Sequence, residues 1–494
     1  MLNFFKNKIG FLGVFYFILL FFYLLSQFVF LSADSDLIIS GGSRGGWTDE
    51  GLNTIQIRNW VSHYHFNLMD CDNFLKTPLF SLFLFPFFKV FGVNFLMARS
   101  LTLFFCLALL CVFYFNKKTI LIGVTFVLTT MTLLPIHQYS HMCLAEMYSS
   151  MLLVISALIL SFHKNDKVYF QFVVLFLILL IVVLFKIQFI YVLLIPLIMS
   201  LIGCFYYSDI FNRSWMKLSF GFLIIIIVCI LFLWILPFKK EWLMVSKQQS
   251  GGILLDSINF DLIWRNIRAN FIGKRYFLFS FLFFISLIVA IKGLLKRQYS
   301  KEYVKLLLFC LSWFILELHK LTLDYLPIRY LLSFYLSMGF FISIVIGYYL
   351  NNNKFKLITT SSIFCLICIN SFFYYKAYSE RTYTVKKLNL YFQKQNNKND
   401  VVIGSWAPAF NWESKSLAFP IWNDFLGERE VFKYYSPDFI VSEINQEDSD
   451  SVYLKRGIKL DKCCQTLMTT KVAFWYLNIY KVKKITNVSH KRPS

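Results

Sequence analysis

The sequence lacks the cysteine spacing of a disulfide framework or of a zinc site. Most of its 11 cysteines stand within apolar runs, where cysteine behaves as a small hydrophobic side chain. No small-residue cleavage site follows the first apolar run, so this run is not typical of a removable signal peptide. The apolar runs hold few charges and show no internal repeat, which argues against a transporter with charges buried in mid-membrane.

Apolar residues, by contrast, make up 58% of the 494 residues and include 58 phenylalanines. Soluble domains contain roughly 45–50% apolar residues, and no water-soluble fold of this length could bury the excess. The bilayer is therefore the expected solvent and partner. The net charge of +22 is spread over short loops rather than gathered in one domain, which excludes nucleic acid as an expected partner.

Apolar segments of spanning length predict a polytopic α-helical membrane protein with about eleven transmembrane helices. The segments lie at 10–31, 94–115, 119–135, 147–162, 168–184, 188–205, 218–237, 276–295, 303–319, 331–350 and 357–374. With the N-terminus in the cytoplasm, every inside loop is short and basic, as the positive-inside rule requires. Richness in Lys, Asn, Ile and Phe favours a bacterium, and hence its inner (plasma) membrane.

This topology predicts two domains. Residues 1–375 form the transmembrane domain, with external loops at 32–93, 136–146 and 238–275, and with 78–91 as a helix lying in the outer interface. Residues 376–494 form a small extracytoplasmic α/β domain. Its expected strands lie at 401–404, 439–441 and within 472–482, where apolar and β-branched residues are bounded by turn residues.

Two acidic residues, Asp49 and Glu50, stand in the first external loop, just before the helical spacing of 52–61. Peptide dipoles stabilise carboxylates at a helix N-terminus, so this pair could simply cap the helix. Lys76 closes the same loop, where it is either a point charge for a lipid phosphate or a lysine snorkelling at the interface.

Further ionisable residues fall on the same predicted side. Glu146 enters an apolar run, which requires a partner or a function; a structural salt bridge to Arg99 is the alternative. Lys186 lies between two apolar runs. The loop 238–275 holds a basic excess that includes Arg265 and Arg268, and an anionic ligand outside would explain it, although long loops tolerate either charge.

In this order, these motifs resemble the GT-C superfamily of glycosyltransferases, and most of all its protein O-mannosyltransferase and aminoarabinose-transferase branch. The resemblance covers roughly residues 10–375, and each motif is short. The matching elements are Asp49-Glu50-Gly51, Lys76-Thr77-Pro78-Leu79, Phe91-Gly92, Ala98-Arg99-Ser100, Glu146, Lys186 and Pro327-Ile328-Arg329-Tyr330.

The resemblance implies Asp49 as general base, within a catalytic carboxylate set that also includes Glu50 and Glu146. It implies that the donor phosphate is bound by basic residues, for which the candidates are Lys76, Lys186, Arg329, Arg265 and Arg268. At the position where the family has its second acidic motif, this sequence has Glu146 alone and no neighbouring second carboxylate. A divalent metal ion is therefore left open as a cofactor, with His141 and Glu146 as the candidate ligands.

The expected reaction is inverting transfer of a sugar from a polyprenyl-phosphate donor to a hydroxyl on the outer face of the membrane. The expected acceptor is a glycolipid, a polysaccharide or a protein, and lipopolysaccharide of the cell envelope is among the candidates. Two alternatives are an O-antigen ligase or polymerase and a transporter of lipid-linked sugars. The early position of the acidic motif disfavours the ligase, whose main functional loop usually comes late in the chain.

Overall fold

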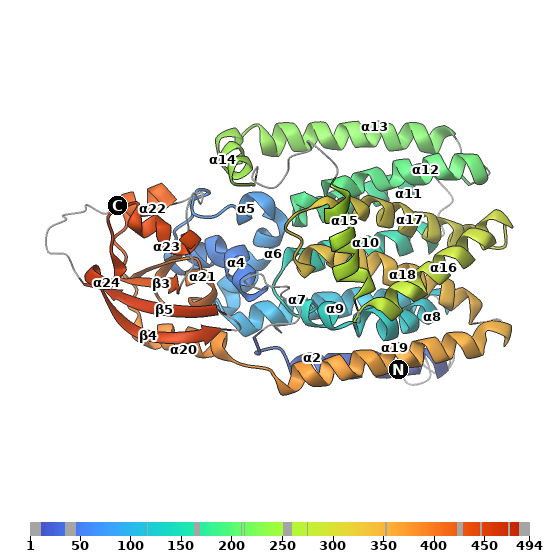
Figure 1. Ribbon diagram of the computed structural model, residues 1–494. Helices are drawn as coiled ribbons and strands as arrows, with labels where there is room; N and C mark the ends of the chain where they lie inside the picture. Colours follow the sequence, from blue (N-terminus) through green and yellow to red (C-terminus); the bar gives the residue numbers. More distant parts are fainter. Residues whose placement is uncertain are drawn as a thin grey trace.

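The chain folds into a long helical bundle with a β-sheet at one end (Figure 1). The computed structural model describes residues 11–34, 46–115, 117–162, 168–208, 210–211, 213–249, 259–273, 275–350, 353–421, 428–444, 447–472 and 475–483. Parts of two expected external loops, 35–45 in the first and 250–258 and 274 in the last, lie outside these ranges.

The bundle is built from α-helices joined by short 3-10 and π-helical turns. The α-helices are α2 (Phe11–Phe28), α4 (Gly46–His63), α5 (Asn73–Lys76), α6 (Pro78–Phe91), α7 (Phe95–Cys111), α8 (Lys117–Phe126), α9 (Leu134–Tyr139), α10 (Ala145–Phe162), α11 (Val168–Phe185), α12 (Ile195–Tyr206), α13 (Arg213–Ile230), α14 (Lys239–Gln249), α15 (Phe260–Ile267), α16 (Phe277–Leu295), α17 (Lys301–Glu317), α18 (Leu332–Tyr349) and α19 (Asn353–Ser379). The 3-10 helices are η1 (Val112–Phe115), η3 (Ile187–Leu194), η6 (Leu318–Thr322) and η7 (Ile328–Leu331). The π-helices are η2 (Val127–Met131), η4 (Leu231–Ile235) and η5 (Arg268–Ile272).

This is an integral, multi-pass membrane protein. Within the described ranges, seven helical stretches are long and apolar enough to span a bilayer: Phe11–Phe28, Phe95–Phe115, Ala145–Phe162, Ile187–Tyr206, Ser214–Ile235, Phe277–Leu295 and Ile328–Tyr349. Each of the eleven predicted segments overlaps a helix, but the count of eleven is not confirmed. The segments near 119–135 and 168–184 are shorter apolar helices, and α17 carries charges at both of its ends.

Two helices form the centre of the bundle. About 94% of the residues in the span that contains α18 are buried, and 83% of those in α10, against 22% in the span that contains α13. Small residues let α18 approach its neighbours closely, as is common between membrane helices. A Cβ added at Gly339 would lie 2.1 Å from the Thr130 hydroxyl, so glycine is required at this contact.

The C-terminal region forms the predicted small α/β domain. Its elements are α20 (Thr384–Gln395), β1 (Val401–Ile403), α21 (Ala407–Phe410), β2 (Leu417–Phe419), α22 (Glu428–Tyr434), β3 (Phe439–Glu443), α23 (Glu447–Leu454), α24 (Leu460–Cys463), β4 (Cys464–Val472) and β5 (Trp475–Val482). The strands form one mixed sheet in the order β2-β1-β3-β5-β4, in which β1 is parallel to both neighbours and β5 is antiparallel to both of its own. Helix α19 extends past residue 375 to Ser379 before this region begins.

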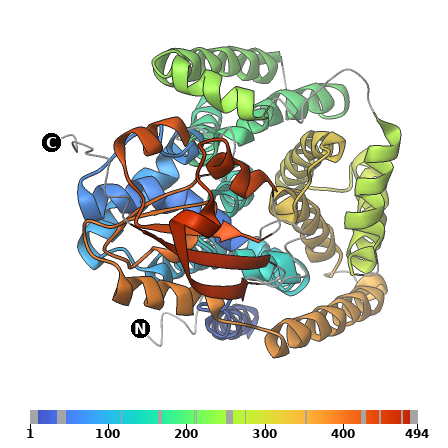
Figure 2. The same ribbon diagram turned by 60° about the vertical axis from the view of Figure 1, so that its left-hand side comes forward.

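Helix α4 lies between the bundle and the sheet (Figures 1 and 2). A Cβ added at Gly51 would lie 2.5 Å from the backbone nitrogen of Ala409, so α4 and α21 touch backbone to backbone. Two turns further, the buried Arg58 donates to the carbonyls of Ser414 and Ser416, and Asn59 donates to the Ala418 carbonyl at 2.9 Å. Helix α4 is thus held on the C-terminal domain by buried polar contacts.

Candidate functional site

The first turn of α4 directs its two acidic side chains to different places, since consecutive residues of a helix point about 100° apart. Glu50 is fully buried and is held at both oxygens by Arg99, whose Nε donates to Oε1 at 2.9 Å and whose Nη2 donates to Oε2 at 2.6 Å. The Cys143 backbone N–H also donates to Oε1, at 2.8 Å. Both carboxylate oxygens of Glu50 are therefore occupied by structural contacts.

Asp49 is partly exposed and lies 3.0 Å from Nε of Arg329, measured from its Oδ2. Burial raises the pKa of Asp49 above its ordinary value; Arg329 opposes that shift, and the nearby Glu146 adds to it. Lys186 also lies close enough to act on the Asp49 carboxylate. A carboxylate with a raised pKa, partly open to solvent, has the properties of a general base.

The second acidic residue, Glu146, begins α10 and pairs with Lys186, the residue that precedes η3. Both side chains are buried. Arg99, which was weighed as the partner of Glu146, is bound to Glu50 instead. The predicted cation Lys186 is therefore not at the surface but neutralises a buried carboxylate.

Tyr330 is the common neighbour of three of the five predicted basic residues. The Arg329 guanidinium lies 5.0 Å from the centre of its ring, and Nζ of Lys186 lies 5.9 Å from it. Lys76 is close enough to interact electrostatically with the Tyr330 hydroxyl. Hence two cations lie over one aromatic ring, and a third, from a distant part of the chain, acts on its hydroxyl.

Lys76 itself is bonded to Asp72, four residues earlier in the chain. Burial alone would lower the pKa of Lys76, but the Asp72 carboxylate outweighs this effect, so that the pKa is raised. Lys76 is thus held protonated. Asp72 and the buried Tyr139, which lies near Asp49 and Arg329, are site residues that the sequence analysis missed. Asp72 could have been found from the sequence, because it stands four residues before Lys76, a spacing that lets side chains on one helix face pair.

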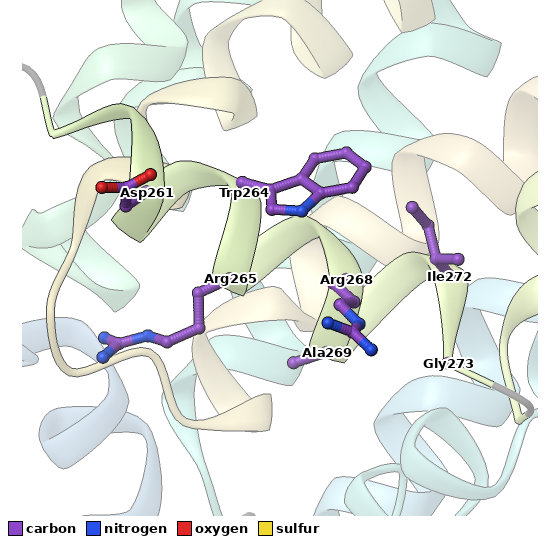
Figure 3. A pocket seen from close by; sticks show the side chains of 7 residues that line it. All are labelled: Asp261, Trp264, Arg265, Arg268, Ala269, Ile272 and Gly273. Atoms are coloured by element: carbon purple, nitrogen blue, oxygen red, sulfur yellow. The ribbon is translucent and has the colours of Figure 1, made fainter.

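Arg265 and Arg268 occupy a different place. They line an open cavity of about 670 Å³ on α15 and η5, together with Trp264 (Figure 3). In Figure 1, α15 runs crosswise to α13 and α19 on the flank of the bundle. Arg265 donates to the exposed Asp324 at 3.0 Å. None of the residues that line this cavity belongs to the cluster around Tyr330, so the structure separates the predicted phosphate-binding residues into two groups.

The candidate metal ligands do not fit a metal site. Nδ1 of His141 is hydrogen-bonded to the Gln27 side chain at 2.7 Å, while Glu146 pairs with Lys186. Burial lowers the pKa of His141 well below its ordinary value, and Arg99 adds to this effect. In the described part of the chain, no three His, Cys, Asp or Glu side chains are grouped so that they could hold an ion. No step of the chemistry below is therefore assigned to a metal.

Comparison with solved structures shows which fold this is. The crystal structure of ArnT from Cupriavidus metallidurans bound to undecaprenyl phosphate matches with a TM-score of 0.58 at 10% sequence identity, covering 94% of this chain and 97% of that one. The apo structure of the same protein matches over the same shares with a TM-score of 0.51. No family model and no curated protein matches the sequence. The chain therefore has an ArnT-like fold over nearly its whole length.

Proposed function

We propose that this protein transfers a sugar from a polyprenyl-phosphate donor to a hydroxyl of an envelope acceptor, with inversion at the anomeric carbon. The observation that carries the proposal is the convergence of Lys76, Lys186 and Arg329 on Tyr330, beside the carboxylates of Asp49 and Glu146. Anionic leaving-group chemistry needs such a set of fixed cations. The fold of a protein crystallised with undecaprenyl phosphate supports the choice of donor.

Asp49 is assigned as the general base, and Glu50 as an anchor of α4, because only Asp49 has a carboxylate free of structural bonds to Arg99. The acceptor oxygen attacks the anomeric carbon, and its proton passes to Asp49. The bond from that carbon to the phosphate oxygen breaks, and the leaving polyprenyl phosphate gains one negative charge. A base on the face opposite the leaving group gives inversion.

The cations change partners in this scheme. Arg329 pairs with Asp49 in the structure, but a bound phosphate would compete for the guanidinium, which binds phosphate in a bidentate manner. Withdrawal of Arg329 leaves the Asp49 carboxylate available to the acceptor. Lys186 keeps its pairing with Glu146 while its positive charge acts on the phosphate, and Lys76 contributes a further charge. The donor thereby activates the base that acts on the acceptor.

Arg265 and Arg268 are assigned to a different step, the capture of the donor phosphate from the membrane surface. They are exposed, they border a cavity, and Trp264 beside them is a residue type that prefers membrane interfaces. The proposed topology places the sheet domain and this flank on the outer side of a bacterial inner membrane, with the N-terminus in the cytoplasm. All the proposed groups then face one compartment.

The test is a mass-spectrometric comparison of lipids and glycans from cells with the wild-type protein, without it, and with Asp49→Asn. Loss of a general base lowers rates by about 10²–10⁴-fold. Both defective strains should accumulate a polyprenyl-phosphate sugar, and one glycoconjugate should lose that same sugar, which identifies both substrates. If Asp49→Asn cells match wild type while the null strain differs, Asp49 is not the base, and a ligase or transporter explains the protein better.

A further inference from the structure

A third buried ion pair, in addition to those of Glu50 and Glu146, lies at the end of α17. Glu317 is completely buried and accepts hydrogen bonds from the hydroxyls of Tyr191 and Ser333, both at 2.6 Å, and from Nε1 of Trp313 at 3.1 Å. Its other oxygen lies 2.6 Å from Nζ of Lys320. A carboxylate this deep in an apolar helix is costly unless it has partners, and here it has four.

Lys320 extends the cluster toward the site. Its Nζ donates to the backbone carbonyl of Tyr330 at 2.8 Å. The same ammonium lies 5.2 Å from the ring centre of Phe189 and 5.5 Å from that of Tyr191. Lys320 therefore fixes the main chain at the residue that follows Arg329, while it packs on η3.

These contacts link the two segments that carry the site's cations. Tyr191 belongs to η3, which begins directly after Lys186. Tyr330 and Ser333 flank the start of α18, directly after Arg329. The segments are far apart in sequence, and Glu317 with Lys320 binds them both. The cluster therefore contacts both the segment that carries Lys186 and the segment that carries Arg329.

We propose that Glu317 and Lys320 are positioning residues that hold Lys186 and Arg329 at the separation needed for the donor phosphate. This inference rests on the proposed transferase function. A buried ion pair rarely stabilises a fold more than apolar residues of the same size, so its selective value lies in the geometry that it imposes. Through Arg329 the cluster also influences Asp49, because a displaced guanidinium no longer lowers the pKa of that carboxyl.

The decisive variants keep the ion pair and remove hydroxyl groups that bond to it, although Ser333→Ala also removes the acceptor of a 2.9 Å bond from Nε1 of Trp313. Tyr191→Phe and Ser333→Ala each delete one hydroxyl that donates to Glu317. Loss of one hydrogen bond to a charged group corresponds to about tenfold in an equilibrium constant. The donor KM should therefore rise several-fold in each variant, and the acid limb of the pH–rate profile should move to higher pH. The matched control is Ser312→Ala, whose hydroxyl bonds only the Leu308 carbonyl in the same helix and should change neither quantity.

A double variant, Glu317→Gln with Lys320→Met, removes both charges and so leaves no unpaired one. It should raise the donor KM more than either hydroxyl variant and move the acid limb further. If the folded Tyr191→Phe and Ser333→Ala proteins both keep the donor KM and the acid limb of the wild type, the positioning role is wrong. This holds even if their thermal stability falls. Should purified wild-type protein neither bind polyprenyl phosphate nor transfer a sugar, the proposed function fails first, and the two failures are thereby distinguished.

Discussion

Two groups of basic residues differ in almost every physical respect. Lys186 and Arg329 are largely buried and paired with carboxylates, and they face one aromatic ring. Arg265 and Arg268 are exposed on a helix at the flank of the bundle, where the ion pair of Arg265 with Asp324 stands in solvent. The buried group is preorganised at a desolvation cost, whereas the exposed group is hydrated and adaptable.

In the proposed reaction, the contrast separates two tasks that an anionic donor imposes. A charge that forms during a reaction is best stabilised by cations that are fixed beforehand in a dry site. A charge that arrives from the membrane surface is best captured by exposed cations with free rotation, at little cost in stability. Variants of the buried group should therefore affect folding and chemistry together, and variants of the exposed group should affect substrate capture alone.

The largest effect is expected for Lys186→Met. It leaves the buried Glu146 without its cation, and removing one partner of a buried pair costs about 3–5 kcal/mol. Thermal unfolding in detergent, followed by the loss of the monodisperse peak, should show this. Adding Glu146→Gln removes the unpaired charge and should restore much of the stability. Equal stability of the single variant and the wild type would contradict the pairing.

A smaller and purely functional effect is expected for Arg268→Ala. The donor KM should rise by about tenfold, the value of one charge-assisted hydrogen bond to phosphate, while the unfolding temperature stays unchanged. Salt should weaken donor capture by the wild type more than by the variant, because exposed charges are screened. Lys240→Ala, an exposed cation of α14 in the same loop, serves as control. A fall in kcat without a change in KM would place Arg268 in the chemistry instead.

A pH titration of activity distinguishes Asp49 from an exposed carboxylate. Burial raises the pKa of Asp49, so the base becomes protonated at a higher pH than a free aspartate, whose pKa is about 3.9. Activity should fall about tenfold per pH unit below that raised value. The same shift favours the neutral carboxyl in the fold, so ionisation of Asp49 lowers stability as pH rises through its folded pKa. An acid limb at the pKa of a free aspartate would contradict the burial.

The smallest effect is expected for Asp324→Asn, which removes the exposed partner of Arg265. Exposed ion pairs contribute about 0–1 kcal/mol, so the unfolding temperature should hardly change. Donor capture should be equal or slightly improved, because Arg265 loses a competing carboxylate. A marked loss of stability would show that this flank is not the adaptable surface that its exposure indicates.

Much of the fold could be predicted because membrane helices can be recognised from the apolar composition of short segments of the sequence. The helix expected at 78–91 coincides with α6, and β1, β3 and β5 lie within or near their predicted ranges. The sequence analysis missed β2 and β4 for physical reasons. The first has three residues, and most residues of the second are exposed or half-exposed, so neither shows a buried apolar alternation. The count of spans depends on helix ends that charges and π-turns make ambiguous.

Several residues of the candidate cluster could be named from the sequence, but their pairings could not. Asp49, Glu146 and Lys76 each stand out because ionisable groups border apolar runs. Which cation meets which carboxylate depends on contacts between residues far apart in sequence, and the partner weighed for Glu146 proved to be that of Glu50. Glu317 was overlooked although it falls inside the predicted span 303–319, where a carboxylate is itself a signal of function.

The contact of α4 with the C-terminal domain has a consequence for how the protein is made. Gly51 and Arg58 emerge from the ribosome more than 350 residues before the backbone at 409–416 that they touch. Because chains are synthesised from the N-terminus, Arg58 has no carbonyl partners until most of the chain has been translated. The helix that carries Asp49 therefore reaches its final environment only once the sheet domain has folded. An interrupted chain lacks this environment, so that completion of synthesis and onset of activity are coupled by the fold itself.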